Sequence, residues 1–430
     1  MISTALVYLW NKRVGAIAWD RESRLGTFEF DPAFIRNEWN VAPIKMPLQG
    51  SAGRIYSFTE NRDSQTFKGL PGLIADALPD KYGNALINVW LSRNGRAAES
   101  LNPIEQLCFI GKRAMGALEF EPVDPNVSAK PEKIELDSLI EIAQQVLSGR
   151  QEFRTNLSEN EEKALIDILK IGTSAGGARA KAVITFNPRT KEVRSGQADA
   201  AKGFSHWIIK FDGVHDLELG HSSGYGRVEM AYNLMAIDAG IEMMECRLLE
   251  ENGRAHFMTR RFDRTEANQK LHVQSFCAMA HYDFNNITAF SYEQLFETMR
   301  SLLLPYPQAE QLFRRMVFNV VAQNCDDHTK NFAFMMNNRG EWKLAPAFDI
   351  CHAYRPDSIW VSQHALSVNG KRKDITRSDL KAVAASMNIK KADKIIDNIL
   401  AVVANWKSYA SKTGVAENLK TSIGKTLIDL

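Results

Sequence analysis

The stretch Asn324-Cys-Asp-Asp-His-Thr-Lys-Asn-Phe-Ala-Phe-Met-Met336 decides the fold, because it is a strongly polar loop that runs directly into a strand. Before it, six apolar residues recur with helical spacing and predict one buried helix face. They are Leu312, Phe313, Met316, Val317, Val320 and Val321. The loop is followed by two predicted strands, 332–336 and 342–345, around the turn Asn337-Asn-Arg-Gly340. The segment therefore predicts a helix, a polar loop and a hairpin, and the chain then reaches Asp349.

Working outward, the preceding part of the chain predicts strands and one helix. A glycine-rich loop begins at Gly172 and is followed by β-branched or apolar runs at 182–186 and 206–211. A helix is predicted over 226–239, where Gly240 ends it. The order from residue 172 is thus loop, strand, strand, helix.

The two ends of the chain have different patterns. The N-terminal part predicts strands at 5–10, 14–19 and 26–30 and helices at 81–90 and 103–109. The stretch 122–133 is rich in Pro, Asp, Ser and Lys, which indicates a domain boundary near residue 130. The tail predicts helices. Thr376-Arg-Ser-Asp379 has the form of a capping box, and Ile395, Ile399, Val403 and Trp406 share a helix face.

Composition restricts the class of protein. A chain of 430 residues with 45% apolar residues is long enough for two or three packed lobes. The formal net charge is +2, much less positive than is typical of a protein that binds nucleic acid by itself. The five cysteines are scattered and show no Cys-x-x-Cys spacing, which favours a reducing cytoplasm. The sequence predicts neither a signal peptide nor a membrane span.

The polar loop has the residues that phosphoryl transfer requires. That reaction needs a carboxylate to accept the proton of the attacking hydroxyl, and oxygen ligands to hold Mg²⁺. Asp326 and Asn331 are five residues apart, the spacing of the base and the metal-binding Asn in the H-R-D-x-x-x-x-N loop of protein kinases. Asp327 misses that spacing by one residue, which favours Asp326 as the base. Asp349 follows the hairpin, where a kinase places its main magnesium carboxylate, although Phe348-Asp-Ile-Cys351 lacks the usual Phe-Gly after the Asp.

Two further features could bind a nucleotide. Lys210 ends an apolar strand, where a buried ammonium requires an anionic partner, and Glu229 on the next helix is the predicted partner. The loop Gly172-Thr-Ser-Ala-Gly-Gly-Ala-Arg179 could surround phosphates with backbone N–H groups, but it matches neither G-x-G-x-x-G nor a Walker A motif.

Each of these features has a simpler interpretation when it is taken alone. Asp326-Asp-His328 could be part of a metal-dependent hydrolase or a hydrogen-bonded turn. Lys210 could be a strand-end lysine that reaches solvent, the glycine loop a plain turn, and Asp349 a cap or a surface ion pair. All four occur in the order found in kinases, and this order favours phosphoryl transfer.

Several motifs together resemble the HipA family, the serine/threonine kinase toxins of bacterial toxin–antitoxin systems. The resemblance covers essentially the whole chain. It depends on seven stretches, which are 77–81 (Ala-Leu-Pro-Asp-Lys), 115–118 (Met-Gly-Ala-Leu), 174–181 (Ser-Ala-Gly-Gly-Ala-Arg-Ala-Lys), 206–210 (His-Trp-Ile-Ile-Lys), 261–264 (Arg-Phe-Asp-Arg), 326–331 (Asp-Asp-His-Thr-Lys-Asn) and 346–349 (Pro-Ala-Phe-Asp).

The resemblance implies a role for each matching residue. Asp326 would be the catalytic base, Asn331 and Asp349 the magnesium ligands, and Ser174 the site of an autophosphorylation that inactivates the kinase. The other implied residues contact ATP. Over or near the phosphates these are Gly176, Gly177, Ala178, Arg179, Ala180, Lys181, Lys210, His328 and Lys330, and at the adenine they are Arg260, Arg261 and Phe262.

The resemblance also implies the architecture and the partners. The expected fold is α+β, with a small N-terminal α+β subdomain (1–128), a kinase-like two-lobed catalytic domain and an all-helical C-terminal portion. The nucleotide lobe with the Gly-rich loop and Lys210 would span 129–265, and the helical catalytic lobe 266–430. The cofactors would be ATP and Mg²⁺. The acceptor would be a serine of an aminoacyl-tRNA synthetase, whose modification stops translation and causes dormancy.

The implied partner is a small helix-turn-helix antitoxin, HipB-like, through which the protein would contact operator DNA. No membrane partner is expected. Two other functions remain open at this point. One is a kinase-like co-repressor with little turnover, which acts with its DNA-binding partner. The other is a kinase of related architecture that phosphorylates a small molecule.

Overall fold

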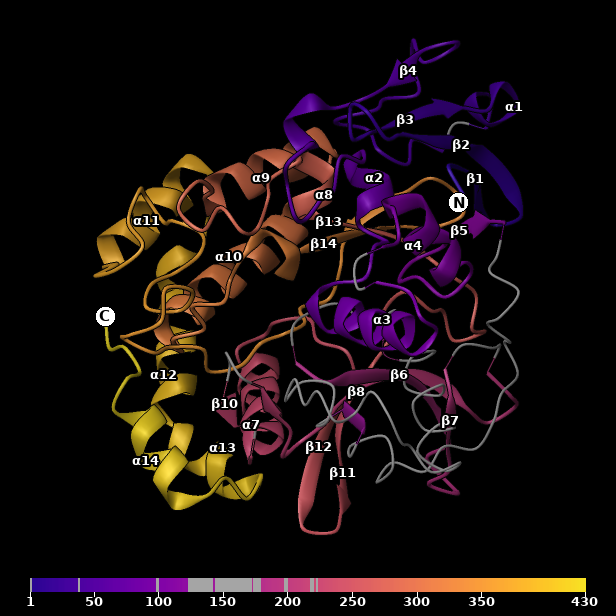
Figure 1. The fold of residues 1–430 in the computed structure, drawn as a ribbon. Coiled ribbons are helices and arrows are strands. Elements are labelled where there is room, and N and C mark those ends of the chain that lie inside the picture. Colours follow the sequence, from indigo (N-terminus) through magenta and orange to yellow (C-terminus); the bar gives the residue numbers. More distant parts are fainter. Residues whose placement is uncertain are drawn as a thin grey trace.

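The computed structural model describes residues 2–37, 39–97, 100–122, 142–143, 172, 179–196, 200–216, 220–221 and 223–430. Figure 1 shows an N-terminal sheet (indigo), a second sheet (magenta), and orange to yellow helices that pack beside both. Within these described ranges, no helix is long and apolar enough to cross a membrane.

The N-terminal sheet is antiparallel and has the order β4-β3-β2-β1-β5. Side chains alternate along β1, so that Ala5, Val7 and Leu9 are buried while the residues between them are more exposed. The strands are β1 (Thr4–Leu9), β2 (Lys12–Asp20), β3 (Leu25–Phe30), β4 (Ile55–Tyr56) and β5 (Leu118–Glu121). The predicted strands at 5–10, 14–19 and 26–30 are thereby confirmed.

Helices follow β3 and β4 in the chain, and polar side chains fix where two of the helices begin. One of them, α3, packs against β6 (Lys181–Phe186) and β8 (Ser205–Lys210) of the second sheet. Asn102 and Glu105 form a capping box at the start of α4, and Asp80 caps α3. The helices are α1 (Pro32–Ile35), η1 (Thr59–Asn61), α2 (Gly72–Ala75), α3 (Lys81–Arg93) and α4 (Pro103–Ile110). The two helices predicted from periodicity correspond to α3 and α4.

The second sheet has the order β11-β12-β8-β6-β7, and all of its neighbouring strands are antiparallel. Helix α7 packs against β11 and β12. The elements are β6 (Lys181–Phe186), β7 (Val193–Ser195), β8 (Ser205–Lys210), β9 (His215–Asp216), β10 (Gly220–His221), α7 (Tyr225–Asp238), β11 (Cys246–Glu251) and β12 (Arg254–Arg260). Gly240 has φ 75°, which agrees with its predicted role at the end of α7.

The remaining part is helical around one small sheet, β13-β14-β15, and contains the largest apolar core. Helix α10 supplies the buried face predicted from the sequence, including Phe313, Val317 and Val320. The elements are β13 (His272–Ser275), α8 (Phe276–Ala280), α9 (Tyr292–Ser301), α10 (Tyr306–Val321), η3 (Thr329–Asn331), β14 (Ala333–Met336), β15 (Trp342–Leu344), α11 (Arg377–Ser386), α12 (Ala392–Ala404), α13 (Trp406–Lys412) and α14 (Glu417–Gly424). The α+β class with a helical C-terminal portion is confirmed.

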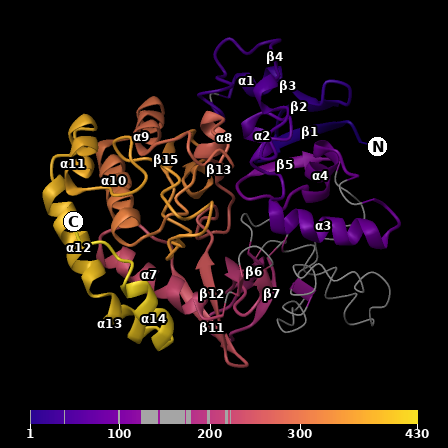
Figure 2. The same cartoon turned by 60° about the vertical axis from the view of Figure 1, so that its left-hand side comes forward.

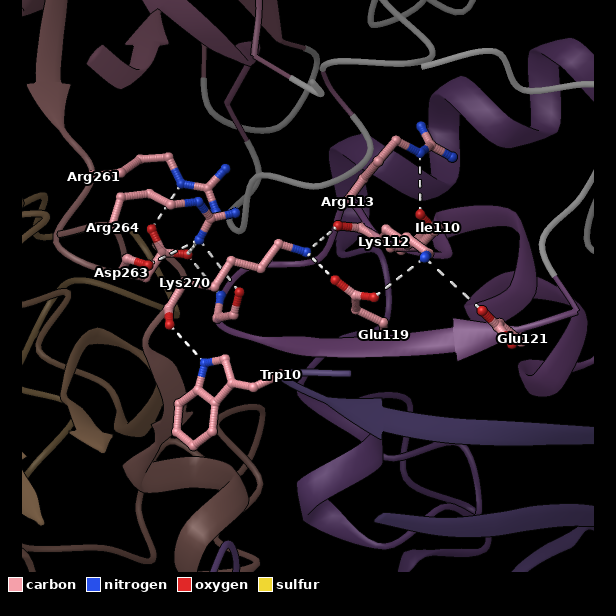
Figure 3. Close-up of polar contacts among 11 residues, drawn as sticks. Trp10, Ile110, Lys112, Arg113, Glu119, Glu121, Arg261, Asp263, Arg264 and Lys270 are labelled. Atoms are coloured by element: carbon pink, nitrogen blue, oxygen red, sulfur yellow. Dashed lines mark hydrogen bonds and ion pairs between the residues drawn. The ribbon is translucent and has the colours of Figure 1, made fainter. Parts of the chain in front are cut away.

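A buried ionic cluster joins the N-terminal sheet to the rest of the chain. Asp263 is fully buried and accepts hydrogen bonds from Arg261 (2.8 and 2.5 Å), from Arg264 (2.8 Å) and from the backbone N–H of Gly116 (2.7 Å). Beside it, Lys270 binds Glu119 on β5 at 2.7 Å (Figure 3). The two stretches 115–118 and 261–264 therefore meet directly. The predicted boundary near residue 130 lies outside the described residues, and the three-part domain division stays a prediction.

Candidate active site

The polar loop after α10 holds Asp326 and Asn331 close together. The side-chain Nδ2 of Asn331 donates to the backbone carbonyl of Asp326 at 2.7 Å, and the Asn331 N–H donates to His328 O at 2.9 Å. Thr329 fastens the same turn by donating from its hydroxyl to Tyr282 O at 2.8 Å. This geometry explains why five residues separate the two side chains, since a single turn of 3₁₀ helix brings them to one side of the loop.

Asp327 has a different surrounding from its neighbour. Its carboxylate is buried and accepts from the Tyr292 hydroxyl (2.8 Å) and the Ala365 N–H (2.7 Å), and it pairs with His364 Nδ1 at 2.9 Å. Burial opposes charge on His364, but Asp327 raises the pKa of this histidine to about 10. Asp327 thus fastens the loop to residues 364–365 with both of its carboxylate oxygens, whereas half of the Asp326 side chain is exposed.

Asp349 is placed by the β14–β15 hairpin and by the segment that leaves it. Ala347 donates to Glu242 O at 2.8 Å, which fixes the chain two residues before Asp349. Asp349 itself has φ 52°, a left-handed conformation that few residues except glycine, asparagine and aspartate adopt. Such conformations concentrate at functional sites, where the surrounding structure stabilises them.

Lys210 lies between two carboxylates. Its Nζ donates to Glu229 Oε1 on α7 at 2.5 Å and to Asp349 Oδ1. Burial alone would lower the pKa of Lys210, but Asp349 and Glu229 raise it above its ordinary value. Burial opposes ionisation of Asp349 as well, but Lys210 and Lys181 lower its pKa to about 2. Asp349 is therefore ionised at neutral pH.

A second lysine lies opposite the first across the sheet. Lys181, the first residue of β6, is the direct antiparallel partner of Lys210 on β8. Like charges that face each other across two strands are destabilising unless anions compensate them. Burial lowers the pKa of Lys181, while Asp80 and Asp349 oppose that effect. The lysine pair provides a concentrated positive charge that suits a phosphate chain.

Asp326 has the electrostatic character of a proton acceptor. Half of the Asp326 side chain is exposed, but the carboxylate lies deep among protein groups. This burial and the nearby carboxylates of Asp349 and Asp327 raise its pKa, although His328 opposes the rise. The Nε2 of His328 lies 3.8 Å from Asp326 Oδ1, and its Nδ1 is buried without a hydrogen-bond partner among the described residues. A carboxylate with a raised pKa binds a proton more readily than an ordinary one, as a general base must.

The N-terminal part contributes two acidic residues that sequence reasoning missed. Asp76 accepts hydrogen bonds from the N–H (2.6 Å) and the hydroxyl (2.7 Å) of Ser275, beside the polar loop that holds Asp326 and Asn331. Burial raises the pKa of Asp80 to about 6, while Lys181 and Lys330 act in the opposite direction. In the sequence, Asp80 was noted only as part of the 77–81 motif, and that motif did not predict a role for it.

The predicted adenine segment is only partly available to a ligand. The Arg261 side chain is buried and engaged by Asp263, and Arg260 binds the exposed Glu266 at 2.8 Å. Phe262 stacks on Phe348 with 5.4 Å between ring centroids. Of these three residues, Phe262 presents the flat apolar surface that suits an adenine ring.

Part of the glycine-rich loop lies outside the described residues. This applies to Thr173, the predicted autophosphorylation site Ser174, and Gly176, Gly177 and Ala178. The described end of the loop leads into the sheet, because Ala180 accepts from the Phe211 N–H at 3.0 Å. The guanidinium of Arg179 lies 4.8 Å from the ring centroid of Tyr225, at the start of α7. Arg179 and Lys181 therefore reach the side of the site that contains Lys210.

The donor set fits Mg²⁺ bound together with a nucleotide. The hydrogen bond of Asn331 Nδ2 leaves its Oδ1 to face a cation, and Lys210 occupies only one oxygen of Asp349. Among the described residues, no three His, Cys, Asp or Glu side chains form a metal cage. Mg²⁺ is usually held by one or two carboxylates together with substrate phosphates, and a complete protein cage is not needed for it.

Two sequence profiles cover most of the chain. Residues 5–121 match the HipA N-terminal domain, and residues 173–406 match the HipA-like C-terminal domain. No curated protein sequence matches the chain significantly.

Solved structures match the chain to different degrees. The chain is similar to HipA in the Shewanella oneidensis MR-1 complex of HipA, HipB and operator DNA, with a TM-score of 0.65 and 17% identity over 98% of this chain and 94% of that one. The Helicobacter pylori proinflammatory kinase CtkA matches with a TM-score of 0.33 and 12% identity, over 58% of this chain and 92% of that chain.

Proposed function

The chain belongs to the HipA family, and on this premise we propose that it is an ATP- and Mg²⁺-dependent serine/threonine protein kinase of a toxin–antitoxin system. The observation that carries the proposal is the convergence of Lys210, Glu229 and Asp349 beside the loop of Asp326 and Asn331. A lysine on a central strand, its glutamate on the next helix and a carboxylate after a hairpin are the parts that position phosphates in kinases.

The residues of this chain divide the work as follows. Asp326 accepts the proton of the attacking hydroxyl, and its raised pKa suits that role. Lys210 and Lys181 bind phosphate oxygens, and His328 and Lys330 lie at the same loop. Asn331 and Asp349 would hold Mg²⁺, and Phe262 would pack against adenine. When bound, ATP would supply the transferable phosphoryl group, and Mg²⁺ would neutralise negative charge on the phosphate oxygens.

The partners follow from the family. The Shewanella oneidensis HipA was solved with HipB and operator DNA. We therefore propose a small helix-turn-helix antitoxin as partner, through which this cytoplasmic protein contacts its operator. The proposed acceptor is a serine of an aminoacyl-tRNA synthetase, and phosphorylation of Ser174 would inactivate the kinase.

The proposal is tested by intact mass before and after incubation of the phosphatase-treated protein with Mg-ATP. We expect the wild type to gain one phosphate, mapped to Ser174, and to arrest growth when expressed. Asp326→Ala should gain none and should not arrest growth. Asp63→Ala, which removes an exposed carboxylate that pairs with Arg24 at the turn before β3, should behave as wild type. An Asp326→Ala protein that is folded and still gains phosphate would refute the assignment of the base.

A further inference from the structure

A short loop follows Asp349 in the chain. We call its residues 355–361 the apolar-tip loop. Its ends meet, because the Arg355 N–H donates to Val361 O at 3.2 Å. Inside it, the Ser358 hydroxyl accepts from the N–H groups of Trp360 (3.2 Å) and Val361 (3.3 Å). These bonds hold the tip, Ile359 and Trp360, in a defined conformation.

The tip exposes two large apolar side chains in succession. Ile359 is 73% exposed and Trp360 is 42% exposed. Within the described part of the chain, the other exposed large apolar residues are not adjacent to one another in sequence. They are Ile55, Ile237, Leu303 and Tyr306. Tryptophan is enriched at the centres of protein interfaces, because it buries much surface with little loss of conformational freedom.

The segments on both sides of the apolar-tip loop are attached to residues 323–327, around Asp326. On one side, Ala353 donates to Gln323 O at 3.0 Å and accepts from the Cys325 N–H at 3.1 Å. On the other side, Asp327 binds His364 at 2.9 Å and the Ala365 N–H at 2.7 Å. Cys325 and Asp327, the residues on either side of Asp326, therefore each take part in one of the two attachments. In Figure 2, the orange loops between β15 and α11 lie between α10 and β12.

We infer that Ile359 and Trp360 bind the protein substrate, through an apolar side chain that flanks its acceptor serine. This inference rests on the proposed protein kinase function and specifies its substrate. The attachment to the catalytic loop fixes the distance between the tip and Asp326. A segment whose hydroxyl lies at Asp326 therefore passes the same tip each time, and this constant geometry gives sequence specificity.

The base of the loop lies beside the site. Burial raises the pKa of Tyr225, and Arg355 is close enough to oppose that rise. The guanidinium of Arg179 lies 4.8 Å from the Tyr225 ring centroid.

The test uses the full-length protein after phosphatase treatment, incubated with Mg-ATP and a library of serine peptides. In this library, each position that flanks the serine is fixed to one amino acid at a time. The variants are Ile359→Ser with Trp360→Ser, and the control Leu303→Asn. Leu303 is 89% exposed and has φ 55°, a conformation that asparagine accepts, so the control removes an equally exposed apolar residue elsewhere.

We expect the wild type and Leu303→Asn to prefer an apolar residue at one or two flanking positions. The double variant should lose this preference and raise the KM for the preferred peptide about tenfold or more, as for loss of an interface tryptophan. Its rate of autophosphorylation should stay within about twofold of wild type, which a merely structural defect would not allow.

Three outcomes would overturn the inference. The first is an apolar preference that survives in the double variant. The second is a wild type that phosphorylates itself but no peptide, or that shows no apolar preference. The third is an equal loss of autophosphorylation and peptide transfer in the double variant. A wild type that transfers phosphate neither to itself nor to any peptide would instead show that the proposed kinase function is wrong.

Discussion

At the scale of single residues, Lys210 is held by two acids with different roles. Asp349 is ionised, and the cation of Lys210 helps to keep it so. Burial raises the pKa of Glu229, although Lys210 opposes that rise. In the proposed kinase, Glu229 would therefore orient the ammonium, while Asp349 would remain charged for a metal ion. This division predicts different results for the loss of Glu229 and for the loss of Lys210 itself.

We predict that Glu229→Gln lowers kcat/KM for ATP about 10- to 100-fold, because the ammonium loses its orienting carboxylate, while Lys210→Met lowers it by about 10²- to 10³-fold. Lys210→Met should also lower the melting temperature, since it leaves Glu229 and Asp349 without their cation. Initial rates of autophosphorylation and thermal unfolding measure both effects. Glu250→Gln, at an exposed pair with Arg227, is the matched control. Wild-type kinetics for Glu229→Gln would contradict the orienting role.

At the scale of elements, the catalytic loop is fastened by the ion pair of Asp327 and His364. The folded-state pKa of His364, about 10, exceeds its ordinary value of 6.5. Its contribution to stability is therefore complete below pH 6.5, and it is lost as the pH rises towards and through 10. In Asp327→Asn, the buried histidine has no carboxylate partner and this contribution disappears.

We predict that Asp327→Asn lowers the free energy of unfolding by about 2–4 kcal/mol at pH 6 to 7 and by much less at pH 10. Urea unfolding of wild type and variant across this pH range measures the difference. Asp357→Asn, on the exposed apolar-tip loop, should change stability by less than about 0.5 kcal/mol at every pH. A difference between wild type and Asp327→Asn that does not vary with pH would contradict the ion-pair explanation.

Local patterns predicted many elements but not how they meet. The apolar face at 312–321 and the hairpin after it correspond to α10 and β14–β15, and the capping box at Thr376 begins α11. The β11–β12 hairpin was not predicted, because no residue of Cys246–Glu251 is fully buried and the strand lacks a buried alternation. The approach of Asp80 to Lys330 is a long-range contact, and no local pattern contains it.

At the scale of the whole molecule, Asp263 joins the N-terminal sheet to the segment that leads to Phe262. Burial opposes ionisation of Asp263, but Arg261 and Arg264 lower its pKa far below the ordinary 3.8. Its contribution to stability is therefore present above pH 3.8, and it is lost as the pH falls towards the folded-state pKa. The same carboxylate accepts the Gly116 N–H, so one buried charge serves both parts of the chain (Figure 3).

We predict that Asp263→Asn lowers the free energy of unfolding by about 3–5 kcal/mol at pH 7, because two buried guanidinium groups lose their counter-charge. The variant should also unfold in two calorimetric steps, since the N-terminal sheet loses the buried part of its ionic attachment and keeps the pair of Lys270 with Glu119, whereas the wild type should unfold in one. Differential scanning calorimetry measures both effects. Glu266→Gln removes a carboxylate that binds Arg260 but is 88% exposed, and it should change stability by less than about 1 kcal/mol. A single unshifted transition in Asp263→Asn would mean that apolar packing, and not this charge cluster, holds the two parts together.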